Sequence, residues 1–526
     1  MSLPAKRLPI GIQSFEKLQK NECVYADKTK LIYDLVNQGS WFFLSRPRRF
    51  GKSLLCSTLR ALFEGRRDLF ENTLIAQSDW KWAAVPVIHV SFSSMSYESV
   101  AVFKTSFNQR LDFMAEDFGV DVRASQTPGD KIMRMLELLG KKQPIVLIVD
   151  EYDKPLIDNL TNKEVVGEIR DILRDFYDSI KNSDEYLRFV FITGVTKISK
   201  VSIFSDMNNL EDISMVERYQ SLCGYTLDQI HENFSSHITE WADAENIDRS
   251  VVIQNLQEHY NGYCFGIDFT QKVFNPYSVL LALSQKKLKN YWFESGTPLF
   301  LTKVLREQLH AVERFESLEI SESEFESADI DFLSIKILLY QTGYLTIKSY
   351  NKTDRTYVLG YPNAEVAHAF INKLMFYVGK LSESDFSAGI RKIRLALQSD
   401  DIELFVEQFN HMLSMIPFML FKRGEAFYQT IFFLICQAAG FKTRVEVATA
   451  LGSIDAMIEF GSKKYIFEFK IDDSAKKALE QIKRKEYYRG FLAQATKQQL
   501  VLVGVSFDTV TRQINEYEIE RMNTIM

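Results

Sequence analysis

The segment at residues 45–53 has the composition of a loop that binds phosphate. It reads Ser-Arg-Pro-Arg-Arg-Phe-Gly-Lys-Ser and stands between an apolar run at 41–44 and a run of helical period at 54–63. A strand, a loop that ends Gly-Lys-Ser and a helix form the context of a P-loop, in which backbone N–H groups hold phosphate oxygens. Lys52 would reach the β- and γ-phosphates, and the Ser53 hydroxyl would ligate Mg²⁺. The sequence therefore predicts a nucleoside triphosphate site.

A second run further along the chain ends in two adjacent carboxylates. Residues 144–151 read Pro-Ile-Val-Leu-Ile-Val-Asp-Glu, an apolar strand pattern that ends in Asp150 and Glu151. This is typical of a Walker B strand, in which Asp150 holds the water around Mg²⁺ and Glu151 polarises the water that attacks the γ-phosphate. A solvated strand end is the alternative for an acidic pair taken alone. Together with Lys52 and Ser53, however, the pair favours a site that hydrolyses ATP.

Residues close to these motifs leave alternatives open. Arg46 stands where the motif usually has its first glycine, and with Arg48 and Arg49 it would touch phosphate, touch a neighbouring subunit or be solvated. Thr193 or Thr196 would sense the γ-phosphate or only cap a turn. The residues that we expect to bind the nucleotide are Arg46, Arg49, Phe50, Gly51, Lys52, Ser53, Leu54, Asp150 and Thr193.

A further group of charged residues lies near the C-terminus. Asp455 stands in one strand pattern, Glu468 and Lys470 stand in the next, and Glu425 stands in the helical pattern before them. Because side chains alternate along a strand, Glu468 and Lys470 point to the same face. Asp455 and Glu468 would hold Mg²⁺ or Mn²⁺ at a scissile phosphate, while Lys470 would orient water or stabilise the developing charge. Glu425 would hold a water molecule or a second metal ion.

The helical pattern that follows these strands is rich in basic residues. Its residues would follow a nucleic-acid backbone or form a solvated face. They are Lys476, Lys477, Gln481, Lys483, Arg484, Lys485 and Arg489, with Tyr487 and Tyr488 among them. Over the whole chain 63 Lys and Arg stand against 69 Asp and Glu. The resulting net charge of −6 neither indicates nor excludes a nucleic-acid partner.

The composition excludes several classes of protein. The chain has 526 residues, of which 46% are hydrophobic and 25% charged, and this balance rules out intrinsic disorder. No apolar run is long enough to cross a membrane, so we expect no membrane partner. Five cysteines without a C-x-x-C pair predict reduced thiols in a cytoplasmic protein. Seven dispersed histidines predict that any metal ion is held by oxygen ligands.

The elements that must position these residues fall into three regions. Residues 1–230 alternate apolar runs with helical patterns, which predicts a parallel sheet covered by helices on both faces. Residues 231–420 have mainly helical periods, and residues 421–526 have helix, antiparallel strands, helix and strand in that order. The buried strands expected in the first region are 41–44, 87–90, 145–149 and 189–192. The run at 87–90 suggests an extra strand between the P-loop strand and the Walker B strand.

Over nearly its whole length the chain resembles a known architecture. The segments that carry the resemblance are Leu-Pro-Ile-Gly at 8–11, Tyr-Ala-Asp-Lys-Thr at 25–29, the loop at 46–53, Val-Asp-Glu-Tyr-Asp-Lys-Pro at 149–155, Thr-Gly-Val-Thr-Lys at 193–197, Asn-Pro-Tyr at 275–277, and the runs at 291–298, 339–344 and 360–363. With them, residues 8–226 look like the AAA-ATPase-like domain family, and the C-terminal region looks like nucleases of the PD-(D/E)xK superfamily. The implied fold class is α/β: an AAA-like P-loop NTPase sheet, a helical middle or lid region, and a restriction-endonuclease-like C-terminal domain.

The resemblance also implies site residues. In that family arginine replaces the first P-loop glycine, so Arg46 is a family trait. ATP and Mg²⁺ would bind through Lys52, Ser53 and Asp150, with Glu151 for hydrolysis, and the nuclease-like fold would use Glu425, Asp455, Glu468 and Lys470. Two departures are that no proline precedes Asp455 and that Lys485, not tyrosine, is fourth after Gln481 in the Q-x-x-x-Y motif of some branches.

Two hypotheses for function follow. The first is a nuclease for DNA or RNA that is controlled by ATP binding or hydrolysis, a pairing suited to bacterial defence against phage or mobile elements. The alternative is a nucleotide-dependent switch or interaction protein whose nuclease-like domain binds but does not cleave. Intact Asp455, Glu468 and Lys470 favour the first, since binding alone needs no such set. An arginine supplied by a neighbouring subunit would demand a homo-oligomer, and the sequence nominates no arginine for that role.

Overall fold

The chain folds into two compact units. The computed structural model describes residues 5–160, 162–197, 203–204, 207–294, 318–326, 334–370, 383–416, 425–449, 452–461, 463–488 and 499–523. One unit comprises Met1–Phe300 with Ser317–Val366, and the other comprises Leu301–Glu316 with Ala367–Met526. The three-region division at 230 and 420 stays a prediction.

The first unit is built on a five-stranded parallel sheet with the order β2-β3-β4-β1-β5. Its strands are β1 (Trp41–Ser45), β2 (Val87–Ser91), β3 (Ile145–Asp150), β4 (Leu187–Gly194) and β5 (Glu211–Asp212). The four expected strands are confirmed, and their apolar residues are buried because both faces of the sheet are covered. The extra strand expected between the P-loop strand and the Walker B strand is present as β2, which follows β1 and precedes β3 along the chain. In the sheet, β4 lies between β1 and β3 and β2 lies at the edge, because the chain crosses over after β3.

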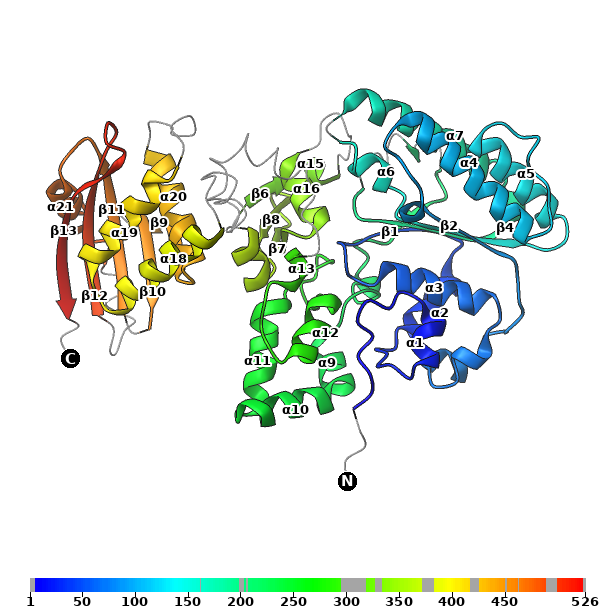
Figure 1. Cartoon of the computed structure of the whole chain (residues 1–526), viewed down its shortest axis with the longest axis horizontal. Coiled ribbons are helices and arrows are strands. Elements are labelled where there is room, and N and C mark those ends of the chain that lie inside the picture. Colours follow the sequence, from blue (N-terminus) through cyan, green and yellow to red (C-terminus); the bar gives the residue numbers. More distant parts are fainter. Residues whose placement is uncertain are drawn as a thin grey trace. The chain divides into compact units, whose positions relative to one another are not determined.

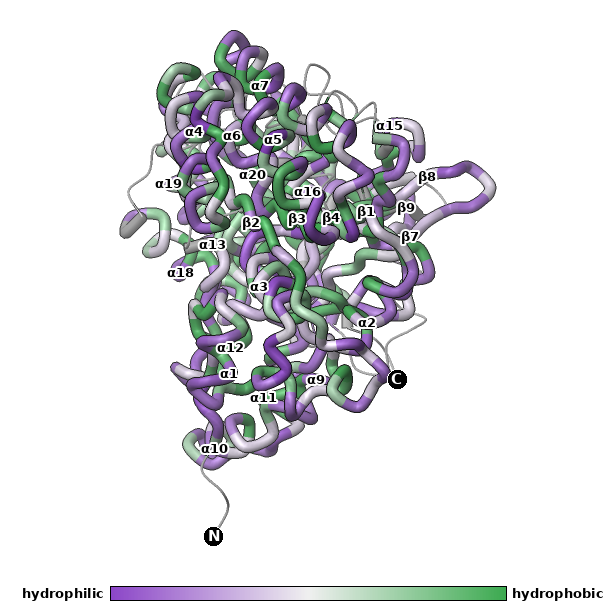
Figure 2. The backbone as a smooth tube through the Cα atoms, turned by 90° about the vertical axis from the view of Figure 1, so that its right-hand side faces the viewer, coloured by the Kyte–Doolittle hydropathy of each residue, from purple (hydrophilic) through white to green (hydrophobic). Residues whose placement is uncertain are grey.

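Helices cover both faces of this sheet (Figure 1). One face carries α4 (Val100–Asp117), α5 (Pro128–Gly140) and α7 (Lys163–Lys181), and the other carries α1 (Phe15–Lys20), α2 (Thr29–Gln38) and α3 (Lys52–Phe63). In α7 the buried residues recur every three or four positions, as in Val166, Ile169, Leu173 and Phe176. Figure 2 shows the matching alternation of hydrophilic and hydrophobic residues along this helix. The short α6 (Lys154–Ile157) follows β3.

The remainder of the first unit is mainly helical, as expected, with one small sheet. Its helices are α9 (Leu227–Asn233), α10 (Ser235–Glu245), α11 (Arg249–Tyr260), α12 (Pro276–Gln285), α13 (Tyr291–Glu294), α15 (Glu322–Glu326) and α16 (Ile335–Thr342). The strands β6 (Leu318–Ser321), β7 (Thr346–Asn351) and β8 (Thr356–Gly360) pair antiparallel in the order β6-β8-β7. These strands were not predicted from the sequence, because they are short and β7 is largely exposed, so its apolar pattern is weak.

The second unit holds a mixed five-stranded sheet with the order β13-β12-β11-β10-β9. Its strands are β9 (Lys442–Thr449), β10 (Gly452–Phe460), β11 (Lys463–Ile471), β12 (Gln499–Asp508) and β13 (Gln513–Asn523). Its helices are α18 (Glu383–Gln398), α19 (Ile402–Ser414), α20 (Glu425–Ala438) and α21 (Ala475–Arg484). The expected helix, strands, helix and strand are confirmed, whereas β13 was not expected because it is an edge strand of mostly polar residues. In the described part of the chain no helix is long and apolar enough to span a membrane.

Candidate functional site

The loop between β1 and α3 has a left-handed backbone at two positions. Gly51 has a φ of +95° and caps α3, which begins at Lys52. A Cβ atom at Gly51 would meet no other atom, so the left-handed backbone, not crowding, favours glycine here. Arg49 also has a positive φ of +69°. The strand, loop and helix predicted from the sequence are therefore all present, and the start of α3 offers its unpaired N–H groups to an anion.

Lys52 lies inside this loop. Its side chain is buried, and its Nζ donates hydrogen bonds to the carbonyl oxygens of Arg46 (2.9 Å) and Pro47 (3.0 Å). Burial lowers the pKa of Lys52, while the charges of Asp150 and Glu151 oppose that shift. The ammonium group is thus held on the concave side of the loop, where it can reach phosphate oxygens.

Asp150 ends β3 in a buried position that suits a hard cation. Its side chain is 3% exposed, and burial raises its pKa, against the opposing effects of the Ser53 hydroxyl and of Lys52. Its Oδ1 has no hydrogen-bond partner among the described residues. A buried carboxylate oxygen without a partner beside a serine hydroxyl fits the Mg²⁺ ligands predicted from the sequence.

Two less expected side chains lie beside this carboxylate. A thiol of Cys56 on α3 and an imidazole of His89 on β2 bring their ligand atoms within 4.8 Å of each other and of Asp150. Burial lowers the pKa of His89 to about 4, so the imidazole is neutral at physiological pH. The dispersed spacing of histidines and cysteines in the sequence gave no sign of this grouping.

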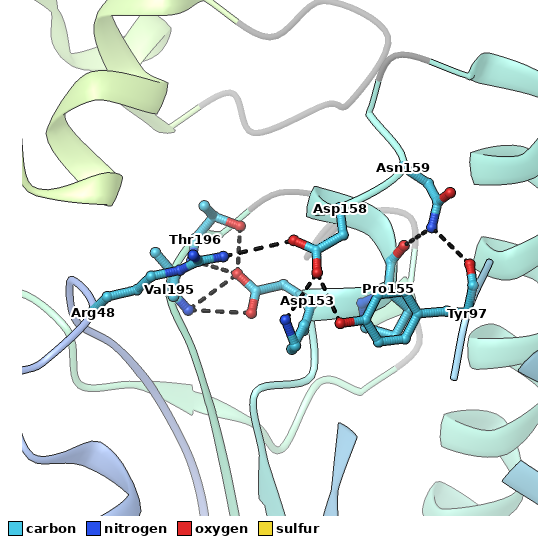
Figure 3. A network of polar contacts seen from close by, with 9 residues as sticks. Arg48, Tyr97, Asp153, Pro155, Asp158, Asn159, Val195 and Thr196 are labelled. Carbon is cyan, nitrogen blue, oxygen red and sulfur yellow. Dashed lines mark hydrogen bonds and ion pairs between the residues drawn. The ribbon is translucent and has the colours of Figure 1, made fainter. Parts of the chain in front are cut away.

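The residues after β3 turn toward the loop that follows β4. Glu151 has a φ of +56°, which is uncommon for a residue other than glycine and is typical of functional sites. Asp153, 1% exposed, accepts hydrogen bonds from Val195 N (3.0 Å), Thr196 N (2.6 Å) and Thr196 Oγ1 (2.7 Å) (Figure 3). Thr193 Oγ1 donates to the carbonyl oxygen of Leu44 (2.8 Å). Asp153 therefore fixes this loop, a role that the sequence analysis missed.

A cavity of about 400 Å³ joins these elements. Of the residues expected to bind the nucleotide or to hydrolyse it, those in its wall are Arg49, Phe50, Gly51, Lys52, Ser53, Leu54 and Glu151. Asp150, Thr193 and Arg46 are not in the wall. The rest of the wall comes from the N-terminal segment and from the helical elements, including Ile12, Tyr25, Lys28, Tyr277, Trp292 and Tyr344. The size and the mixture of apolar, aromatic and charged groups suit a small charged ligand.

Arg46 is buried and supports the loop through hydrogen bonds to backbone carbonyl oxygens. Its guanidinium is 1% exposed and donates to the carbonyl oxygens of Ser45 (2.8 Å), Ser214 (2.8 Å) and Tyr219 (3.2 Å). It also lies over the Phe265 ring at 4.1 Å. The solvated alternative is therefore wrong for Arg46, because carbonyl acceptors and an aromatic face replace water around its charge.

The C-terminal carboxylates meet where two strands diverge. Antiparallel pairing of β10 with β11 ends at Ala456 and Phe467, so Asp455 and Glu468 are the next residues on separating strands. Asp455 Oδ2 accepts a hydrogen bond from Phe469 N (2.6 Å), and Glu468 Oε1 lies 3.7 Å from Lys470 Nζ. Asp455 is 8% and Glu468 1% exposed. Asp455, Glu468 and Lys470 thus gather at the end of the sheet pairing, as a site for a cation would require.

Side chains from two helices support these carboxylates. Gln429 on α20 donates to Asp455 Oδ1 (3.3 Å), and Gln481 on α21 donates to Glu468 Oε1. Gln429 was not expected from the sequence, although it follows Glu425 by one helical turn. Glu425 begins α20, and its side chain lies outside the described residues.

Tyr487 supplies the tyrosine that the linear motif lacks. α21 ends at Arg484, and a turn with Glu486 at a φ of +48° brings Tyr487 N to the carbonyl oxygen of Ile482 (3.3 Å). Burial raises the pKa of Tyr487, and a hydrogen bond between its hydroxyl and Gln481 opposes that rise. A motif search by spacing fails because the turn adds residues between glutamine and tyrosine.

The basic face of α21 is exposed. Lys476, Lys477, Lys483 and Arg484 are all open to solvent. Lys477 pairs with Asp473 (2.8 Å), and Lys483 pairs with Glu520. Both interpretations of this helix, nucleic-acid contact and solvated face, therefore stay open.

Comparison with known proteins identifies relatives for both units. A family model described as a predicted AAA-ATPase matches residues 9–204, and a model of the PD-(D/E)XK nuclease superfamily matches residues 423–517. A protein of Azotobacter chroococcum mcd 1, named only as an uncharacterized protein in the vnfD 5' region, is 33% identical over 531 residues. That alignment covers 98% of this chain and 99% of the relative. The resemblance and the fold class expected from the sequence are confirmed.

Proposed function

Because the chain belongs to a family of AAA-ATPase-like proteins with a C-terminal domain of the PD-(D/E)XK nuclease superfamily, we propose that it binds and hydrolyses ATP and thereby regulates a metal-dependent nuclease for DNA or RNA. One observation carries the proposal: each unit pairs a buried carboxylate with a lysine. Lys52 interacts electrostatically with Asp150, and Lys470 lies 3.7 Å from Glu468. Both reactions need a carboxylate to hold a cation and a lysine to face a phosphate.

The nucleotide site would use groups that the P-loop fold gathers. The N–H groups at the start of α3 and Lys52 would bind the phosphates, while Ser53 and Asp150 would hold Mg²⁺, which supplies positive charge at the phosphate oxygens. Glu151 would accept a proton from the attacking water. Arg49, Phe50, Gly51 and Leu54 would complete the wall, Arg46 would support the loop, and Thr193 would act by holding β4 against β1.

The nuclease site would use the diverging strands. Asp455 and Glu468 would hold Mg²⁺ or Mn²⁺ against the scissile phosphate, and that ion would polarise the phosphate and the attacking water. Lys470, on the same face as Glu468, would stabilise the negative charge that develops on the phosphoryl oxygens. Glu425 would contribute a further water or metal ligand. The exposed basic residues of α21 support a nucleic-acid backbone as the substrate.

The biological setting follows from this chemistry. A nuclease that a nucleotide keeps in check suits defence against phage or mobile elements, since it must stay inactive until foreign nucleic acid is present. All five cysteines are buried free thiols, which supports a reducing cytoplasm as the compartment.

The test is a cleavage assay on circular DNA, linear DNA and RNA with Mg²⁺ or Mn²⁺. We expect Lys470→Ala to abolish cleavage, because the charge that develops on the phosphoryl oxygens then lacks the lysine beside it. Lys464→Ala, a lysine on the same strand that pairs with Glu459 (3.8 Å), serves as the control and keeps activity. Nucleic-acid binding without cleavage in the wild-type protein would favour the interaction-protein alternative instead.

A further inference from the structure

The three arginines of the phosphate-binding loop have different surroundings. Arg46 is buried and donates hydrogen bonds to backbone carbonyl oxygens. The Arg49 guanidinium lies over the Tyr277 ring, 4.7 Å from its centroid. Arg48, within the described part of the chain, is held by one ion pair, with its Nη2 3.6 Å from Asp158 Oδ1. Both side chains of that pair are partly exposed, at 39% and 31%. The Arg48 guanidinium is therefore the least constrained cation of the loop, since partly exposed ion pairs contribute little stability.

The backbone that carries Arg48 is well fixed. Trp292 Nε1 donates to the carbonyl oxygen of Arg48 (3.1 Å), and Gly343 packs so closely on Pro47 that a Cβ atom would lie 2.7 Å from it. Arg48 also forms part of the cavity wall, together with Lys52 and Ser53. A partly exposed guanidinium on a fixed backbone can therefore change partners without moving the loop.

Asp158 keeps other partners if Arg48 leaves. Lys154 Nζ lies 2.8 Å from its Oδ2, and the Tyr97 hydroxyl donates to the same oxygen at 2.8 Å. Figure 3 shows Arg48 reaching to the oxygen of Asp158 that these two partners do not use. Release of Arg48 thus leaves no carboxylate without a hydrogen bond, which keeps an exchange of partners energetically small.

We propose that Arg48 exchanges Asp158 for the γ-phosphate when ATP binds and serves as an arginine finger supplied by the same chain. This rests on the proposed ATPase function and deepens it. In the reaction the water oxygen forms a bond to the γ-phosphorus while the bond from that phosphorus to the bridging oxygen breaks. ADP leaves with the electron pair, and the proton of the water passes to Glu151. Arg48 stabilises the charge on the γ-phosphoryl oxygens during this step.

One consequence is that hydrolysis needs no second subunit. The first test compares Arg48→Ala with Arg134→Ala, an arginine of similar exposure that pairs with Glu137 on α5. We expect Arg48→Ala to lower kcat by at least about hundredfold with little change in KM, because the finger acts only in the transition state. Arg134→Ala keeps the wild-type values. Equal kcat for Arg48→Ala and the wild type would overturn the proposal.

A mixing experiment separates one chain from two. Lys52→Ala cannot hold ATP but carries an intact Arg48, and Arg48→Ala lacks only the guanidinium. We expect the mixture to hydrolyse ATP no faster than either variant alone, because neither chain can supply the group that the other lacks. Recovery of hydrolysis in the mixture would show that the arginine acts between subunits and would overturn the proposal.

Binding measurements distinguish failure of the inference from failure of the proposed function. We expect ADP with aluminium fluoride to bind the wild type more tightly than ADP alone, and Arg48→Ala to lose this difference while it still binds ADP. A difference that survives in Arg48→Ala overturns the inference alone. ADP binding that is equal in the wild type and in Lys52→Ala overturns the proposed function and the inference together.

Discussion

The two candidate sites are built from different parts of the protein. The nucleotide site is built on loops, where Arg49, Gly51 and Glu151 all have positive φ. The C-terminal site is made of side chains on strands, where Asp455 accepts hydrogen bonds from Phe469 N and Gln429. A site built from loops can change its contacts, whereas a site built on paired strands holds its geometry. This contrast suits a regulator and a cutting centre respectively.

The same contrast appears in the buried carboxylates. Asp150 Oδ1 has no hydrogen-bond partner in the described ranges, and Lys52 rests on carbonyl oxygens of its own loop. Glu468, by comparison, accepts from Gln481 and faces Lys470. Glutamine side chains from α20 and α21 orient the carboxylates of the C-terminal site, whereas Asp150 lies beside the hydroxyl of Ser53.

The largest effect is expected from Asp455→Asn. The amide keeps the shape of the side chain and its oxygen can still accept from Phe469 N, but the negative charge that holds a cation is lost. We expect Mg²⁺-dependent cleavage to fall by at least about hundredfold. Asp473→Asn, which removes an exposed charge paired with Lys477, is the matched control and should cleave normally. Normal cleavage by Asp455→Asn would mean that the strand-built site is not the cutting centre.

A smaller effect is expected from Gln481→Ala. Gln481 links Glu468 to Tyr487 and so orients the carboxylate without contacting the substrate. Loss of such support commonly lowers metal affinity or activity by about tenfold to hundredfold. We expect the Mg²⁺ concentration for half-maximal cleavage to rise, and excess Mg²⁺ to restore part of the rate. Tyr487→Phe tests the outer link alone and should have a milder effect. An unchanged Mg²⁺ requirement in Gln481→Ala would argue against pre-orientation.

The smallest effect concerns Lys28 in the wall of the nucleotide cavity. Its Nζ donates to Gln229 Oε1 (2.6 Å), and burial lowers its pKa to about 7 from a usual value of 10.5. Between these values the unfolded chain holds a proton that the folded protein has lost, so stability rises with pH. Below about pH 7 both forms are charged, and this dependence vanishes.

Lys28→Met removes this titration. We expect the free energy of unfolding of the wild type to rise relative to that of the variant between about pH 7 and pH 9, by at most about 1.4 kcal/mol per pH unit. The Tm of the wild type should rise with it. Thermal unfolding of both proteins without nucleotide, at a series of pH values, measures this difference. Parallel pH profiles for the two proteins would show that Lys28 is charged in the folded cavity.

Local patterns in the sequence were sufficient to predict much of the fold. The run of β3 ends in Asp150, and the loop after β1 leads into α3 at Lys52, so both residues could be nominated directly. The order of the strands in the sheet could not be predicted, because the position of β4 depends on a crossover between distant segments. The same holds for Asp153, whose partners Val195 and Thr196 follow another strand.

Spacing rules also failed where the chain leaves regular structure. Tyr487 reaches Gln481 only because Glu486 adopts a positive φ after α21 ends. Arg46 looked like a phosphate contact because it occupies a loop position, but buried carbonyl oxygens offer its guanidinium better acceptors. Neither outcome could be read from residue types alone.

We propose that nucleotide bound at the site of Lys52 controls cleavage at the site of Asp455 and Glu468. The direct measurement is the rate of cleavage of a labelled nucleic acid as ATP concentration is raised, in the wild type and in Lys52→Ala. The account predicts that ATP changes the wild-type rate and leaves the Lys52→Ala rate constant, since that variant cannot hold the phosphates. An identical response to ATP in both proteins would contradict it.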